Sequence, residues 1–128
     1  MHLSARMFEN TGENFAVYAG NDDLVLPLMA QGAAGAISVV SNILPAMMVR
    51  LLDACMDGRF AQAQNLQLAL LPVIRALFAQ VNPIPVKAAL AMMGMIKESL
   101  RLPLTPLEEP HRTQLADILI AMKLVRDE

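Results

Sequence analysis

Only two short stretches of this sequence have the composition of buried β-strands, and a helical segment separates them. The first is residues 15–19 and the second is the string AISVV at residues 36–40. Asp22 and Asp23 supply a helix cap before a short helix at residues 24–31, so the order strand, helix, strand predicts two parallel strands. Two parallel strands leave both edges of a sheet unpaired, and such sheets normally contain more strands. We therefore expect this chain to be the end of a larger α/β domain.

The rest of the sequence predicts helices. From residue 41 onward, apolar residues recur at spacings of three and four, and Pro72 is expected to kink one of the helices. The pattern predicts helices at residues 41–58, 59–81 and 82–95, an extended segment at 100–110, and a terminal helix at 109–125. The isolated chain should thus be mostly helical.

Composition limits the classes of partner. Apolar residues make up 55% of the chain and the mean hydropathy is +0.44, so we expect some apolar surface to be covered by a partner. The net charge of −2, without a basic stripe, argues against nucleic-acid binding. Pro, Gly and polar residues interrupt the longest apolar run, which excludes a membrane span. With no signal peptide and one cysteine, Cys55, the expected location is the cytoplasm.

Four strings carry a resemblance to a known family. VYAGND, GAAGAISVVSNILP, NPIPVKAAL and LRLPLTPL occur in the order and spacing typical of the C-terminal portion of the dihydrodipicolinate synthase family. That family belongs to the N-acetylneuraminate lyase superfamily of (β/α)₈ barrels. The resemblance, from residue 15 to the end, implies that the two strands are the last two of the barrel. It implies a partial barrel at residues 1–58 and a C-terminal helical extension at 59–128, together forming a single compact unit.

The resemblance also implies a reaction. The family forms a Schiff base between pyruvate and a barrel lysine and adds the resulting enamine to aspartate semialdehyde, in lysine biosynthesis. The lysine amine must be unprotonated to attack, so its site must lower its pKa. The family's catalytic motifs lie upstream of the matching portion, so we expect no catalytic residue and no activity from this chain alone. No cofactor is implied, and neither His2 nor His111 has partners at metal-ligand spacing.

A few residues match family positions at the substrate pocket. Gly20 matches a glycine that lines the pocket, and Ile37 matches a residue whose backbone carbonyl faces the pyruvate–lysine adduct. Asn21, Asp22 and Ser38 border the same rim, although the family often has Asp where this chain has Asn21. These residues are expected to form a pocket wall that binds pyruvate only in a complete barrel.

The chain's own lysines and tyrosine are weak substitutes for the missing machinery. Lys97 lies in an Ile-Lys-Glu string like that around the family's catalytic lysine, but we expect it in a helical stretch and not at a strand end. Lys87 matches a scaffold position, and Lys123 is expected to be a solvated charge. Tyr18 lies within a strand, which favours a packing role over a proton relay.

Two alternatives remain open at the level of sequence. The chain could be a non-catalytic helical interaction or oligomerisation protein derived from the barrel tail, or one half of a split enzyme whose other half supplies the lysine. In every case Val17, Ile37 and Val39 are expected on a sheet face that lacks covering strands. We therefore expect the isolated chain to form homo-oligomers, or to associate with the missing barrel half.

Overall fold

The computed structural model describes residues 2–10, 12 and 14–125. By its internal contacts the chain comprises two compact units, Met1–Ala69 and Leu70–Glu128. The sequence predicted one compact unit with a division between residues 58 and 59, whereas the observed boundary falls within helix α4 (Phe60–Leu77). The assignment of residues 1–58 to a barrel and 59–128 to an extension stays a prediction.

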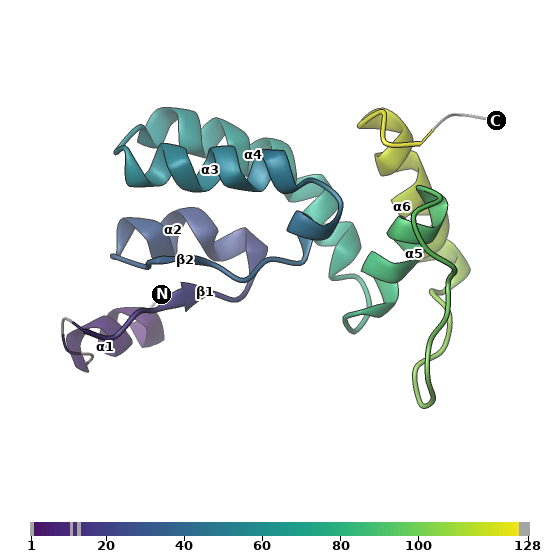
Figure 1. The fold of residues 1–128 in the computed structure, drawn as a ribbon, viewed down its shortest axis with the longest axis horizontal. Helices are drawn as coiled ribbons and strands as arrows, with labels where there is room; N and C mark the ends of the chain where they lie inside the picture. Colours follow the sequence, from purple (N-terminus) through teal and green to yellow (C-terminus); the bar gives the residue numbers. More distant parts are fainter. Residues whose placement is uncertain (1, 11, 13, 126–128) are drawn as a thin grey trace. The chain divides into compact units, whose positions relative to one another are not determined.

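The first unit begins with a helix and a minimal parallel sheet (Figure 1). Its elements, in order, are α1 (His2–Asn10), β1 (Tyr18–Ala19), the 3₁₀ helix η1 (Asp22–Leu24), α2 (Val25–Ala30), β2 (Gly35–Ala36), the 3₁₀ helix η2 (Val40–Asn42), α3 (Pro45–Met56) and the start of α4. Tyr18 pairs with Gly35 and Ala19 with Ala36 in a parallel register, which confirms the predicted direction. The backbone N–H of Ile37 donates to the carbonyl of Ala19 at 2.8 Å and extends the pairing by one residue.

The second strand is shorter than the sequence predicted. Residues 36–40 were expected to be extended, but the ladder ends at Ala36 and η2 begins at Val40. The amides of Val39 and Val40 both donate to the side chain of Asp22 and not to a neighbouring strand. The Asp22 carboxylate therefore accepts the hydrogen bonds of the backbone amides at the end of this strand, and the chain turns there.

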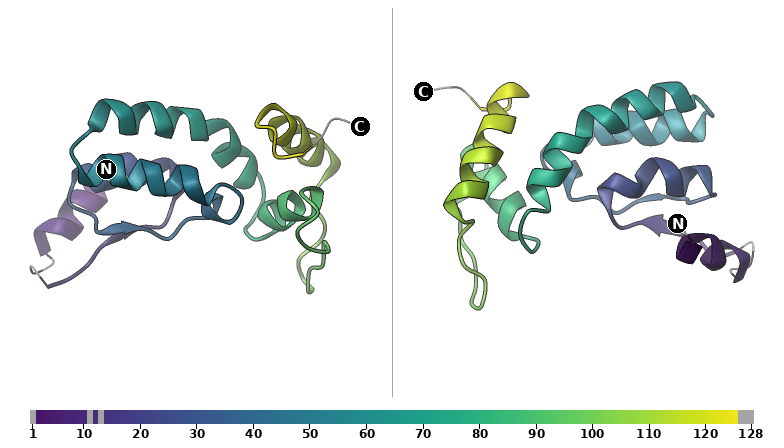
Figure 2. Two further views of the ribbon diagram at one scale, coloured as in Figure 1. Left: turned by 45° about the horizontal axis from the view of Figure 1, so that its top comes forward. Right: turned by 180° about the vertical axis from the view of Figure 1, so that it is seen from behind.

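The two faces of the sheet have different surroundings. Side chains alternate along a strand, so Val17 and Ala19 lie on one face while Tyr18, Gly35 and Ile37 lie on the other. Val17 and Ala19 are buried, and helix α2 packs against β1 (Figures 1 and 2). On the opposite face Ile37 is 73% exposed and Tyr18 52% exposed. The grouping of Val17 with Ile37 on one uncovered face was wrong, because the register sets them on opposite faces; Val39 is half-buried.

Four of the described helices end with the same hydrogen-bond pattern, three of them at a glycine and one at a lysine. After α3, Gly58 has φ +70°, its N–H donates to the Cys55 carbonyl, and the Arg59 N–H donates to the Ala54 carbonyl. After α6 (Glu109–Ala121), Lys123 takes the equivalent left-handed conformation with φ 58°. Glycine adopts this conformation without steric penalty, whereas lysine does not.

The second unit contains the remainder of α4, α5 (Ile84–Met92) and α6. Helices α5 and α6 lie side by side, and the connection between them extends past the ends of both (Figure 2). Leu102 in this connection is 89% exposed. Pro72 lies inside α4, which is continuous through it. Within the described residues, no helix has the length and apolar character needed to cross a membrane.

Candidate functional site

The loops that follow the two strands are joined through one buried carboxylate. Asp22, in the loop after β1, is 1% exposed. Its Oδ2 accepts a hydrogen bond from the Val39 amide at 3.0 Å and another from the Val40 amide at 3.1 Å, in the loop after β2. Hydrogen bonds to an ionised acceptor are stronger than neutral ones, and burial protects them from water. The loops at the carboxyl ends of both strands are thereby held together.

A second buried polar side chain completes this arrangement. Gln67 of α4 is 6% exposed, and its Nε2 donates to the main-chain carbonyl of Asp22 at 3.0 Å. Its Oε1 accepts from the amide of Leu26 at 3.3 Å. Asp22 and Gln67 are the buried polar residues of the described chain, and they belong to one network. Helix α4 thus contacts the loop after β1 directly through hydrogen bonds.

The predicted pocket residues lie in the two loops that Asp22 connects. Gly20 is exposed, and a Cβ placed on it would meet no atom within 4 Å. Asn21 is exposed and its carbonyl accepts the Leu24 amide at 3.0 Å. The Oγ of Ser38 accepts the Ser41 amide at 2.9 Å, so this hydroxyl shapes the loop. Gly20 and Asn21 follow β1, and Ile37 and Ser38 follow β2. Because the two strands are parallel, the structure brings all four residues to the same end of the sheet.

None of the three lysines lies near these loops in sequence or by hydrogen bonding. Lys87, on α5, donates to the carbonyl of Ser99. Lys97 is exposed in the irregular segment after α5, so the helical stretch predicted around it was wrong. Lys123 is exposed at the end of α6. The ring of Tyr18 lies against Gly35, where an added Cβ would approach it to 3.4 Å, which fits a packing role.

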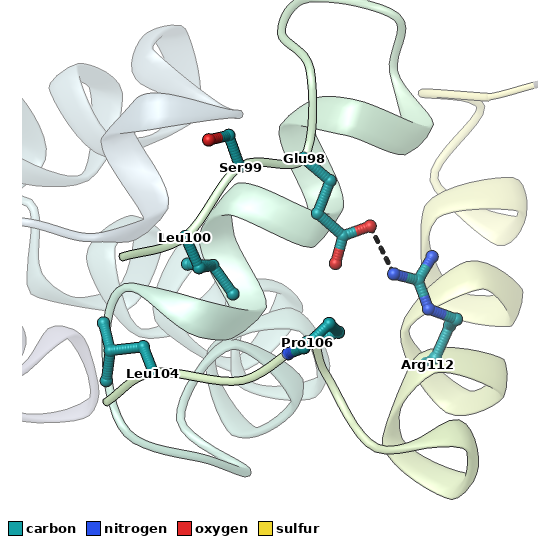
Figure 3. A pocket seen from close by; sticks show the side chains of 6 residues that line it. All are labelled: Glu98, Ser99, Leu100, Leu104, Pro106 and Arg112. Atoms are coloured by element: carbon teal, nitrogen blue, oxygen red, sulfur yellow. Dashed lines mark hydrogen bonds and ion pairs between the residues drawn. The ribbon is translucent and has the colours of Figure 1, made fainter. Parts of the chain in front are cut away.

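A cavity of about 550 Å³, lined by both polar and apolar side chains, lies in the second unit (Figure 3). Glu98 and Arg112 form a hydrogen-bonded ion pair in its lining, and Leu100 and Pro106 form part of its wall. The second carboxylate oxygen of Glu98, Oε1, is buried without a hydrogen-bond partner. Because the guanidinium already neutralises the carboxylate, this pair fixes the segment after α5 against α6.

Two other features offer no site for chemistry. An apolar cavity of about 350 Å³ in the first unit is lined by Met7, Tyr18 and Leu28 among others. Burial raises the pKa of the Cys55 thiol, which keeps it protonated and unreactive. In the described part of the chain, no three His, Cys, Asp or Glu side chains gather as metal ligands, and the side chain of His2 lies outside it.

Gln67 is the residue that sequence reasoning missed. Leu66 is only half-buried, and the buried stripe of α4 runs through Gln67, with Ala63 and Leu70 as its neighbours on the same face. A glutamine at spacings of four and three from buried apolar residues was the available signal, because a polar side chain on such a stripe needs a hydrogen-bond partner. Asp22 was predicted as a cap of its own helix, whereas its carboxylate binds the amides at the start of η2.

Comparison with known proteins points to a single family. The Dihydrodipicolinate synthetase family matches residues 1–122. The chain is 45% identical over 119 residues to the 4-hydroxy-tetrahydrodipicolinate synthase of Methanothrix thermoacetophila, covering 92% of this chain and 40% of the relative. It is similar to the crystal structure of dihydrodipicolinate synthase from Aquifex aeolicus, with a TM-score of 0.93, 36% identity, and coverage of 97% and 43% of the two chains.

A third comparison concerns a structure that contains a ligand. The chloride-inhibited dihydrodipicolinate synthase from Acinetobacter baumannii, solved with pyruvate, matches with a TM-score of 0.89 and 36% identity over 95% of this chain and 42% of that one. The chain therefore spans about two-fifths of the length of each of these relatives.

Proposed function

The chain belongs to the dihydrodipicolinate synthetase family, and from this premise we propose that it forms the C-terminal portion of a pyruvate-dependent synthase that condenses pyruvate with aspartate semialdehyde. In this proposal β1 and β2 are the last two strands of a (β/α)₈ barrel, and the helices from α4 onward form the C-terminal extension. The proposal is supported by similarity over nearly the whole chain to a portion of solved synthase structures.

The observation that carries the proposal is the junction of the two strand-end loops through Asp22. Active sites of (β/α)₈ enzymes lie at the carboxyl ends of the barrel strands, in the loops that follow them. Gly20, Asn21, Ile37 and Ser38 all belong to these loops. We propose that they form one wall of the pyruvate pocket. Gly20 leaves room for pyruvate because it has no side chain, and the backbone carbonyl of Ile37 faces the pyruvate–lysine adduct.

The nucleophile of the reaction comes from elsewhere in this proposal. An unprotonated lysine amine attacks the ketone of pyruvate and water leaves as the imine forms, which requires the amine to lie at the pocket. Lys87 is engaged with the Ser99 carbonyl, and both Lys97 and Lys123 are exposed away from the strand ends in sequence. The chain alone is therefore expected to form no covalent bond with pyruvate, and its pocket wall is expected to bind pyruvate only within a complete barrel.

The test is intact-mass spectrometry after incubation with pyruvate and borohydride, which reduces an imine to a stable adduct. The folded chain alone should show no adduct. A hybrid that joins the N-terminal three-fifths of the Methanothrix thermoacetophila relative to this whole chain should show one pyruvate adduct, on a lysine of the relative's portion. An adduct on Lys87 or Lys97, or no adduct in a folded hybrid, would contradict the proposal.

A further inference from the structure

The network of Asp22 and Gln67 has a consequence for the proposed pocket. Burying a carboxylate is unfavourable unless hydrogen bonds compensate it, so a buried aspartate in a small apolar unit needs a reason. Here the hydrogen bonds that the carboxylate accepts come from the amides of Val39 and Val40. These are the two residues directly after the predicted pocket residues Ile37 and Ser38.

We propose that Asp22 is a positioning residue for the pyruvate pocket and that Gln67 holds it in place from α4. The inference rests on the proposed function. Fixing the Val39 amide fixes the peptide that Ser38 and Val39 share, so it limits where the Ser38 carbonyl and the preceding Ile37 peptide can lie. Gln67 fixes the main chain of Asp22 itself, so α4 controls the same rim.

Asp22 acts through the backbone and not as an acid or base. It is 1% exposed, and its Oδ2 is occupied by two amides. Its Oδ1 is also buried and has no hydrogen-bond partner, so no substrate atom at the pocket surface can reach it. Asp23, the neighbouring aspartate, is exposed and provides a matched control on the same loop.

The first experiment measures amide hydrogen exchange in the full chain by NMR. The Val39 and Val40 amides should exchange slowly in the wild type. Asp22→Ala should speed their exchange about tenfold or more, as expected when hydrogen bonds of roughly 1.4 kcal/mol are lost. Asp22→Asn, which keeps an acceptor oxygen, should restore part of the protection, and Asp23→Ala should leave it unchanged. Equal exchange of these amides in Asp22→Ala and wild type would overturn the inference.

The second experiment uses the hybrid with the Methanothrix thermoacetophila relative and measures the pyruvate concentration that gives half-maximal adduct. Asp22→Ala should raise this concentration about tenfold, because a displaced rim weakens binding, and Asp22→Asn should reverse most of the increase. Leu119→Ala, at a fully buried position of α6, controls for lost stability and should not change the pyruvate requirement. An unchanged pyruvate requirement in Asp22→Ala would refute the positioning role. A hybrid that forms no adduct in wild-type form would refute the proposed function, while the exchange result would still decide the role of Asp22 in the loop.

Discussion

Replacing Gln67 with leucine should destabilise the chain although it increases the apolar content of the core. Gln67 makes two hydrogen bonds, one to the Asp22 carbonyl at 3.0 Å and one from the Leu26 amide at 3.3 Å. Leucine has nearly the same size and nearly the same helix propensity as glutamine, so neither packing volume nor α4 itself should change much. What changes is that a buried carbonyl and a partly buried amide lose their partners.

The expected loss in the free energy of unfolding follows from these two groups, the Asp22 carbonyl and the Leu26 amide. A buried polar group left without a partner costs about 1–3 kcal/mol, so the two losses sum to roughly 2–6 kcal/mol. Burying leucine in place of the amide recovers about 1.5–3 kcal/mol at most. The Gln67→Leu variant should therefore lose about 2 kcal/mol in the free energy of unfolding, the difference between the midpoints of these two ranges.

Urea unfolding, monitored by far-ultraviolet circular dichroism, measures the difference in the free energy of unfolding between wild type and Gln67→Leu. Gln64→Leu is the matched control, because it makes the same chemical change on the same helix at an exposed position. Its free energy of unfolding should stay within about 0.5 kcal/mol of wild type. If Gln67→Leu is as stable as Gln64→Leu, or more stable, the reasoning about the buried network is refuted.

Three further predictions concern other parts of the chain. Lys123→Gly should raise the free energy of unfolding by about 0.5–1 kcal/mol in thermal melts, because Lys123 has φ 58° and glycine avoids that penalty; Lys97→Gly, outside such a conformation, should not. Arg112→Leu should lower the free energy of unfolding by about 1–3 kcal/mol, because it leaves the Glu98 carboxylate without its cation. Adding Glu98→Leu should recover part of this loss in a double-mutant cycle. Because burial raises the pKa of Cys55 above its ordinary value of 9.0, the unfolded chain ionises first as the pH rises. The free energy of unfolding should therefore fall above that pH in wild type, and Cys55→Ala should lack this component of the fall.

The sequence determined the elements and the family. The order of strand, helix and strand implied parallel pairing because a short connection through one helix leaves little alternative, and the register confirms it. The predicted helix end at residue 58 falls at Gly58, which takes positive φ after α3, whereas the helix predicted at residues 82–95 ran past Gly94, beyond the end of α5. The four strings that carried the resemblance lie within the residues that the family matches.

Only the tertiary structure decided which polar side chains matter. Val17 and Ile37 looked equivalent as apolar strand residues, but their faces depend on the pairing register, which a single strand does not specify. Asp22 looked like a local helix cap because its nearest amides in sequence belong to its own helix. Its partners are seventeen and eighteen residues away, and those of Gln67 forty-one and forty-five. Such contacts form only when the strands and α4 pack together, because the distance between two residues in a folded chain is set by packing and not by their separation in sequence.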